Sequence, residues 1–184
     1  EMDLNDFDFD AYLTNDRTLR DPDVVRVERR GRILLRVING AAATVFWIDS
    51  GGVAGRLVAV DGQPVHPLPG TRFGVAMGQR LDIELDLPGD GAWPILALRE
   101  GAHERTGLIL ATAGAEVPVI LGTADEPAPA FDIDLAQEAA LRAISPLAGR
   151  VADASAMRML GGQMQPYRWT INDRVFEERV PVGA

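Results

Sequence analysis

Cysteine is absent from this chain of 184 residues, and histidine occurs only twice. Without a thiol the chain can form no disulfide, no thiolate nucleophile and no thiolate-bound metal site. His66 and His103 are 37 positions apart, in stretches that are typical of loops. A metal site using both would need carboxylates placed beside them by the fold. We therefore interpret them as ordinary loop or surface residues.

Long hydrophobic runs are absent as well, and none approaches the ~18 residues of a membrane-spanning helix. The net charge is −9 and the pI is near 4.7. Basic residues alternate with acidic ones, which argues against a nucleic-acid partner because phosphate binding needs clustered Lys and Arg. No glycine-rich phosphate loop and no Gly-x-Ser-x-Gly motif occurs. Residues 1–10 are acidic rather than basic and then apolar, so we predict no signal peptide in them.

The composition that remains is that of a globular protein, with 47% hydrophobic and 24% charged residues. Its length suits one well-filled domain and a tail. In the run Arg80–Leu87, Leu and Ile alternate with Arg, Asp and Glu, which predicts a half-exposed strand. Similar runs, cut by Gly, Asn and Asp turns, predict an all-β sandwich or barrel. They are Val24–Glu28, Arg32–Ile38, Val45–Asp49, Arg56–Val60, Thr71–Met77, Trp93–Arg99 and Thr106–Thr112.

The sequence changes character after Gly114, where prolines with Ala and Glu between them indicate a linker. Asp134–Ala143 could form a short helix with Asp134 as its N-cap. Residues Met157–Leu160 and Tyr167–Val180 alternate like strands, with Asn172-Asp173 as a possible turn. There is no internal repeat.

Four motifs, taken together, carry a family resemblance. Asp10–Asn15 (DAYLTN), Leu35–Thr44 (LRVINGAAAT), Leu57–Val65 (LVAVDGQPV) and Gly78–Ile83 (GQRLDI) resemble, in order and spacing, the second domain of three-domain, laccase-like bacterial multicopper oxidases. Each motif alone is weak, but four in register are specific. Tyr167–Asn172 (YRWTIN) resembles the first strand of the third domain, although Asp173 stands where that family has glycine.

The resemblance implies a cupredoxin-like Greek-key sandwich, followed by a linker and a stray strand. The division that we expect is residues 1–115 for the middle domain, 116–165 for an interdomain linker and 166–184 for the start of the third domain. In the family, copper is bound by His-x-His and Cys-His motifs of the first and third domains, and none of these exists here. The chain is then a copper-free spacer, not active alone, with no catalytic, cofactor-binding or metal-binding residue.

The parent that this resemblance implies couples one-electron oxidation of a substrate to the reduction of dioxygen to water. Its copper, and this chain's partners, are then in the first and third cupredoxin domains, and the location is periplasmic or secreted. An exposed docking surface could also allow self-association. Two alternatives stay open: a copper-free relative that serves as an interaction or cell-division assembly protein, and a self-contained domain in which Tyr167–Val180 completes its own sheet.

Charged residues in the motifs have a structural interpretation beside a chemical one. Arg36, Arg80 and Asp82 could be taken for a catalytic set, but cross-strand pairing or interdomain docking explains them better. Asp82, Glu84 and Asp86, with Asp6, Asp8 and Asp10, could suggest a hydrolase or a calcium site. We interpret the three on Arg80–Leu87 as the polar face of an exposed edge strand.

Sulfur and aromatic side chains also have two interpretations. Met157, Met159 and Met164 could handle copper, because soft sulfur favours Cu(I), but we expect them to fill one buried strand face. The aromatic residues are expected to pack in the core or between domains; they are Phe46, Trp47, Phe73 and Trp93. Trp47 alternates with Phe46, so it should point to the outer face and would be exposed if a partner domain covers that face.

Overall fold

The computed structural model describes residues 9–175. These residues belong to two compact units, one formed by Phe9–Pro146 and the other containing the residues from Leu147 onward. The predicted division at residues 115 and 165 stays a prediction. Asp6, Asp8 and residues 176–184 lie outside the described part of the chain.

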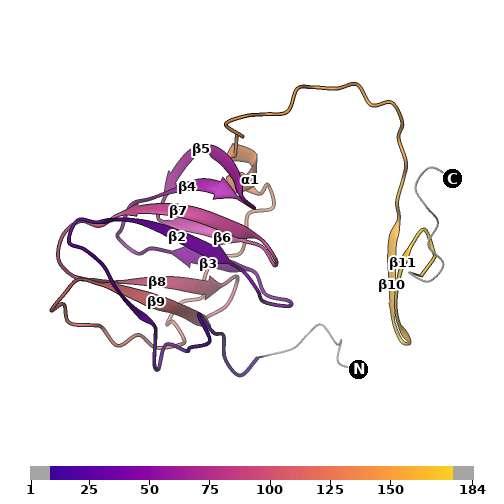
Figure 1. Cartoon of the computed structure of the whole chain (residues 1–184). Helices are drawn as coiled ribbons and strands as arrows, with labels where there is room; N and C mark the ends of the chain where they lie inside the picture. The colour runs from indigo at the N-terminus through magenta and orange to yellow at the C-terminus, as the bar shows by residue number, and fades with distance from the viewer. Residues whose placement is uncertain (1–8, 176–184) are drawn as a thin grey trace. The chain divides into compact units, whose positions relative to one another are not determined.

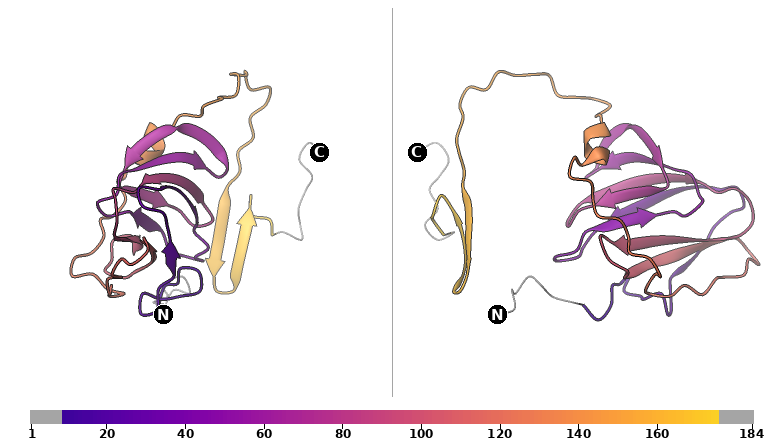
Figure 2. Two further views of the ribbon diagram at one scale, coloured as in Figure 1. Left: turned by 60° about the vertical axis from the view of Figure 1, so that its left-hand side comes forward. Right: turned by 180° about the vertical axis from the view of Figure 1, so that it is seen from behind.

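The first unit is built from two β-sheets that face each other (Figures 1 and 2). One sheet has the order β1-β9-β8-β3-β6 and the other β2-β7-β4-β5. All neighbours are antiparallel except β1 and β9. The predicted all-β sandwich is confirmed. The strands are β1 (Val24–Arg26), β2 (Arg32–Ile38), β3 (Phe46–Asp49), β4 (Gly55–Val60), β5 (Gln63–Gly70), β6 (Arg72–Val75), β7 (Arg80–Asp86), β8 (Ala92–Arg99) and β9 (Arg105–Ala111).

The core forms because apolar residues alternate along each strand and so share its inner face. In β7, Leu81, Ile83 and Leu85 are almost completely buried, whereas the residues between them reach solvent. Full burial of each such side chain stabilises the fold by about 1.5–3 kcal/mol. Phe46 and Phe73 join the same cluster, and Trp93 packs against it. The predicted core role of these three aromatic residues is confirmed.

Strand β5 is the element that the sequence pattern missed. It contains Pro64, Pro67 and Pro69, and prolines normally argue against a strand because they lack a backbone N–H. β5 lies at the edge of its sheet, where β4 is its one strand neighbour and residues 142–144 bond to part of its outer side. Prolines are confined to edge strands and bulges within sheets, and β5 has both features, because its register with β4 shifts between Leu57 and Ala59.

The position of β7 corrects another prediction. Its carboxylates, on Asp82, Glu84 and Asp86, were expected to mark an exposed edge strand. β7 instead lies between β2 and β4. The carboxylates are accommodated in the middle of the sheet because arginines on both neighbouring strands pair with them.

Residues 121–144, which we name the strap, run back along the sandwich and hydrogen-bond to it. At the first end the backbone N–H of Arg105 donates to the Gly122 carbonyl at 2.8 Å, and that of Ala124 donates to the His103 carbonyl at 2.8 Å. At the other end the N–H of His66 donates to the Arg142 carbonyl at 2.8 Å. The strap is therefore held against β9 and β5, two strands of different sheets.

The helix predicted in this segment exists but is shorter than expected. Helix α1 covers Ala136–Ala140 and lies beside β5 (Figure 1). Its N-cap is Leu135, in the left-handed conformation and without a side-chain cap, so the prediction of Asp134 as the cap is wrong. The helix is held by tertiary contacts instead: the Gln137 side chain bonds to β6 and Leu141 packs against the core.

The second unit contains a two-stranded antiparallel sheet of β10 (Leu160–Met164) and β11 (Tyr167–Ile171). Positive φ angles of 51° at Asn172 and 61° at Asp173 confirm the predicted turn. Within the described residues, β11 pairs with β10 and belongs to neither sandwich sheet. The alternative of a self-contained domain, in which Tyr167–Val180 completes its own sheet, stays a hypothesis beside the multidomain one.

Candidate functional site

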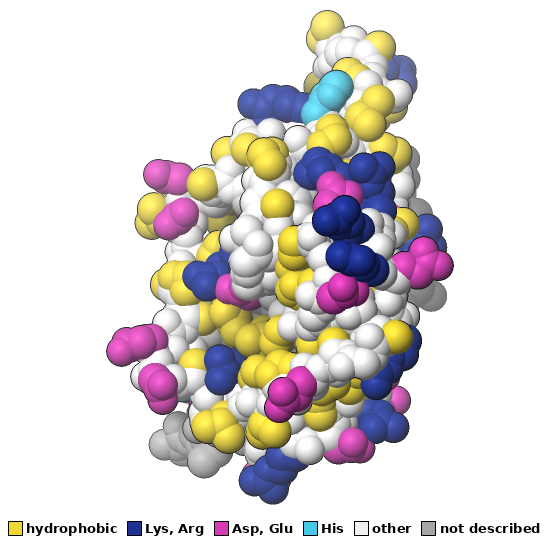
Figure 3. All heavy atoms as spheres, turned by 90° about the vertical axis from the view of Figure 1, so that its left-hand side faces the viewer, with side chains coloured by type: hydrophobic (Ala, Val, Ile, Leu, Met, Phe, Trp, Pro, Cys, Tyr) yellow, Lys and Arg dark blue, Asp and Glu magenta, His cyan; other side chains and the backbone are white. Residues whose placement is uncertain are grey.

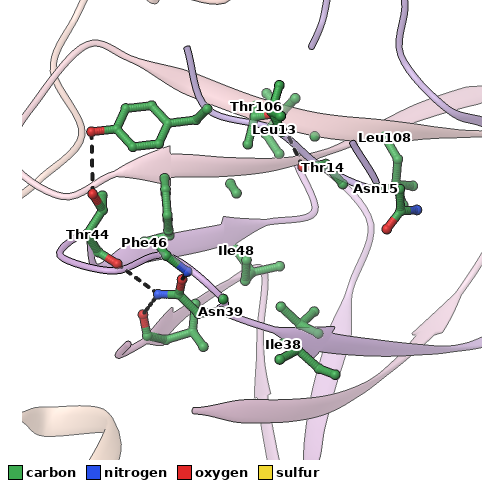
Figure 4. A pocket seen from close by; sticks show the side chains of 18 of the residues that line it. Leu13, Thr14, Asn15, Ile38, Asn39, Thr44, Phe46, Ile48, Thr106 and Leu108 are labelled. Carbon is green, nitrogen blue, oxygen red and sulfur yellow. Dashed lines mark hydrogen bonds between the residues drawn. The ribbon is translucent and has the colours of Figure 1, made fainter. Parts of the chain in front are cut away.

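A pocket of about 440 Å³ opens into the sandwich beside β2. Its walls come from β2 and the loop after it, from β3, β8 and β9, and from the N-terminal stretch around Leu13. Figure 4 shows Ile38 and Ile48 on one side, facing Leu13, Thr106 and Leu108 on the other. Volume and lining are in the range of ligand pockets, which are mostly apolar with a few polar groups.

The polar groups of the pocket are engaged in its own walls. The Asn39 side-chain amide donates to the carbonyls of Thr44, at 2.9 Å, and Val75, at 3.2 Å, while its oxygen accepts from the backbone of Ala41. Thr14 Oγ1 donates to Thr106 Oγ1 at 3.2 Å. These bonds fix the loop after β2 and the N-terminal stretch against the sheets, so the pocket has a defined mouth.

An arginine–carboxylate ladder covers the outer face of the four-stranded sheet. Arg32 Nε lies 2.9 Å from Asp86 Oδ1, and Arg56 bonds both Asp86, at 2.8 Å, and Glu84, at 3.1 Å. Arg36 faces Asp82 across the strands at 3.9 Å, so the predicted cross-strand pairing is confirmed. Figure 3 shows basic and acidic side chains side by side on one face, next to a band of hydrophobic ones.

The ladder changes the titration of two of its members, Asp86 and Arg56. Hydrogen bonds from Arg56 and then from Arg32 lower the pKa of Asp86 below its usual value. The bond to Asp86, followed by the bond to Glu84, raises the pKa of Arg56. Both shifts favour the charged forms, which is the behaviour of a structural ion pair. The Arg80 guanidinium donates to the Asp61 carbonyl at 3.0 Å, a contact with the turn between β4 and β5.

The two histidines lie in separate parts of the fold. His66 is an exposed residue of β5, and His103 is exposed in the turn between β8 and β9, where its Nδ1 lies 2.9 Å from the Ala124 carbonyl. Among residues 9–175 there is no cluster of three or more His, Asp or Glu side chains that could hold a metal ion. The arrangement therefore offers neither paired imidazoles nor a carboxylate cage.

The outer face that carries Trp47 is covered by the strap. The Trp47 indole N–H donates to the Pro129 carbonyl at 2.8 Å, and its ring meets that of Phe131 edge to face, with centroids 4.4 Å apart. Trp47 points away from the core as predicted, but the chain itself supplies its cover. Trp47 is half-buried by these contacts, so part of the face that a partner domain was expected to cover is covered by the strap.

The methionines do not form a buried strand face. Met157 and Met159 are 84% and 61% exposed, and they precede β10 rather than forming a strand of their own. The prediction that they fill a core gap is therefore wrong for these two residues. The backbone N–H of Met159 donates to Asn172 Oδ1 at 2.8 Å, which ties the start of β10 to the turn after β11.

Comparisons with known proteins place the chain in a family. The family model "Multicopper oxidase" matches residues 5–115. The chain belongs to the multicopper oxidase family. The predicted resemblance is confirmed at this level, and the domain is one of the cupredoxin-like β-sandwiches of that family.

Multicopper oxidase MmcO of Mycobacterium tuberculosis is 28% identical over 187 residues. That match covers 98% of this chain but only 35% of MmcO, so the chain spans about a third of this curated relative. Among solved structures, the laccase from Botrytis aclada has a TM-score of 0.61 at 18% identity, covering 83% of this chain and 29% of the laccase. The McoA multicopper oxidase 2F4 variant from Aquifex aeolicus has a TM-score of 0.54 at 14% identity, covering 84% of this chain and 33% of that one.

The pocket beside β2 is the feature that sequence reasoning missed. Its walls lie in motifs that were recognised, Asp10–Asn15 and Leu35–Thr44, but no binding residue was assigned there. A linear pattern tells which side chains point inward, not whether those from facing sheets fill the space between them. The alanines that follow Asn39-Gly40 are the one available signal, because small residues leave room.

Proposed function

We propose that this chain is the copper-free middle domain of a three-domain, laccase-like multicopper oxidase, with its outgoing linker and the start of the third domain. The parent would oxidise a reducing substrate one electron at a time and reduce dioxygen to water. The role of this domain is geometric, because it holds its neighbours in the arrangement that their shared copper sites need.

The observation that carries this proposal is the donor set of the sandwich. A blue copper centre uses a cysteine thiolate and histidines, and a trinuclear cluster uses neighbouring imidazoles. The chain has no cysteine, and His66 and His103 are exposed on separate loops and strands. Because the ligand chemistry is missing from a domain of a copper-binding family, copper in the parent would be bound by the other domains.

The extent of the match to MmcO supports the same arrangement. The family model ends at residue 115, yet the similarity to MmcO covers nearly the whole chain, so the strap and the β10–β11 sheet also have counterparts in a longer oxidase. The partners of this chain would then be the first and third cupredoxin domains. We propose a periplasmic or secreted location on the family resemblance; no helix among the described residues is long and apolar enough to cross a membrane.

The proposal is tested by titrating copper into the purified chain and into the parent polypeptide, side by side. We expect the parent to gain the absorption band of a thiolate–copper bond and to consume dioxygen with a reducing substrate. The isolated chain should do neither. A blue band or turnover by the chain alone would refute the copper-free assignment.

The sequence that flanks these residues in the parent provides the second test. His-x-His and Cys-His motifs in the flanking domains would support the oxidase. Their absence would refute it in favour of a copper-free interaction protein. A parent that binds copper equally well after deletion of residues 9–146 would refute the geometric role of the domain.

A further inference from the structure

The outer edge of β2 carries a row of unpaired backbone groups. β2 is the last strand of its sheet and pairs only with β7. The Leu87 N–H donates to the Gly31 carbonyl and the Asn39 N–H donates to the Gln79 carbonyl, both at 3.0 Å. The backbone N–H and C=O groups of the odd-numbered residues of β2 therefore point toward β7. In an antiparallel ladder the backbone groups of the intervening, even-numbered residues point away from that neighbour. The N–H and C=O groups of Leu34, Arg36 and Ile38 therefore face the free edge, without a backbone partner in the described residues.

The pocket lies along this same edge. Leu35, Arg36, Val37 and Ile38 all line it, so one side of the pocket is the edge strand itself. Leu34 and Ile38 are 46% and 70% exposed, although both are large aliphatic residues. An apolar channel beside a row of alternating donors and acceptors fits an extended peptide, which pairs its backbone with the edge and places every second side chain in the channel.

The charges on β2 specify the other side chains of that peptide. Arg32 and Arg36 project from the outer face of the strand and are 68% and 75% exposed. Arg36 is the less engaged of the two, because its guanidinium reaches only 3.9 Å from Asp82. Opposite charges on directly facing residues stabilise a strand pair. Acidic residues on the outer face of a paired segment would therefore meet Arg32 and Arg36, while its alternate, inward-facing residues would be apolar and lie beside Leu35 and Val37 at the pocket.

We propose that this edge and the adjoining pocket take up an extended segment, alternating apolar and acidic residues, from a part of the parent polypeptide outside residues 1–184. This inference rests on the proposed function, because it needs a longer parent. MmcO leaves about two-thirds of its length outside its match to this chain. A tethered segment acts at an effective concentration of order millimolar, so a modest affinity suffices. A second copy is less suitable, because antiparallel pairing of two β2 strands gathers their arginines on one face.

The experiment measures backbone hydrogen exchange of the whole 184-residue chain, with synthetic peptides as probes. The probe is a blocked peptide of about seven residues in which glutamate and valine alternate, a length that spans a strand such as β2. One control peptide has lysine in place of glutamate, and the other has the probe's composition without alternation. The probe should slow exchange at Leu34, Arg36 and Ile38. The lysine peptide should bind on the order of fivefold more weakly, and the unalternated one should give no protection.

Two variants separate edge pairing from non-specific binding. Leu34→Pro removes an N–H that faces the free edge and not β7, so the sheet should remain and the probe should no longer bind. Arg36→Glu should reverse the preference between the glutamate and lysine peptides. Arg150→Glu makes the same charge change in the other unit and should change nothing. If Leu34→Pro does not fold, the Arg36 reversal decides the question.

The parent polypeptide tests the source of the segment. Without any added peptide, the three edge amides should exchange at least about tenfold more slowly in the parent than in this chain. Equal rates would overturn the proposal even in a parent with all copper motifs. If the edge amides exchange slowly in a parent that lacks those motifs, the edge assignment is supported and the proposed oxidase function is refuted. Slow exchange in the isolated chain before any peptide is added would also overturn it, because the edge would then be covered already.

Discussion

The contact between the strap and β6 provides a sharp test of the packing, through the substitution Gly74→Ala. A Cβ atom at position 74 would lie 2.9 Å from Phe131 Cζ and 3.1 Å from its Cε1, and 3.5 Å from the Trp47 ring. The Phe131 ring is held by its edge-to-face contact with Trp47. It can escape the clash only by leaving that contact, so one added methyl group should lift the strap from the sheet.

The expected cost of Gly74→Ala is about 1–3 kcal/mol of unfolding free energy, the usual range for overpacking. Phe131→Ala alone should cost about 1.5–2.5 kcal/mol, roughly half the value for a fully buried Phe, because its ring is half-buried. In the Phe131→Ala background, Gly74→Ala should cost less than about 0.5 kcal/mol, since nothing remains for the methyl group to meet. The two substitutions are therefore expected to be strongly non-additive.

Urea denaturation followed by far-UV circular dichroism measures all four proteins of this cycle. Gly40→Ala is the matched control, because a Cβ atom there meets nothing within 4 Å, and it should change stability by less than about 0.5 kcal/mol. Additive costs in the double variant would refute the reasoning. They would mean that Phe131 does not occupy the space above Gly74.

Three further predictions address the fold and its charges. A chain that ends at Pro146 should have the same unfolding free energy as the whole chain, to within about 0.5 kcal/mol. A chain that ends at Ala115 should lose more than about 3 kcal/mol in thermal or urea unfolding, because the strap hydrogen bonds, at ~1 kcal/mol each, and the Phe131 packing are lost together. Equal stability of the two truncated chains would contradict the role of the strap. The lowered pKa of Asp86 stabilises the fold above the ordinary carboxyl pKa, and this effect is lost as the pH falls through the lowered value. Asp86→Asn should therefore lower the urea midpoint at pH 7, and the difference from the unsubstituted protein should disappear on acidification. A difference that stays constant with pH would contradict this role of Asp86. Asn39→Asp should lower the unfolding free energy by about 1–3 kcal/mol in urea, because a carboxylate cannot donate to the buried carbonyls of Thr44 and Val75. Unchanged stability of this variant would mean that the two hydrogen bonds contribute nothing.

The strands that the sequence predicted are those whose apolar residues alternate strictly. Arg32–Ile38 was predicted with the bounds that the structure has, because a strand with one buried face leaves a period of two in the sequence. The prolines of β5 hid a strand, since their tolerance depends on lying at a sheet edge, which only the assembled topology defines. The place of β7 inside its sheet was misjudged for a related reason. Its carboxylates look exposed until the arginines of β2 and β4 are brought beside them.

The candidate site was less predictable than the fold. Cross-strand pairing of Arg36 with Asp82 followed from the strand pattern, but the pocket and the covering of Trp47 did not. Both depend on residues far apart in sequence, such as Trp47 and Pro129. The proline-rich composition after Gly114 was interpreted as a linker, and outside α1 the backbone of residues 116–146 is irregular. It contained no signal that this backbone packs on the sandwich, because its partners there are far away in the sequence.

The strap also sets when this domain can finish folding during its synthesis. Gln137 bonds to Gly74 and Ile144 bonds to Pro64, residues 63 and about 80 positions earlier in the chain. Translation proceeds at roughly 5–20 residues per second, so β5 and β6 wait several seconds for the segment that covers them. During that interval the Trp47 face is bare on the nascent chain. A ribosome stalled just after residue 115 would thus present an incomplete sandwich, open to chaperones on the very surface that the finished protein conceals.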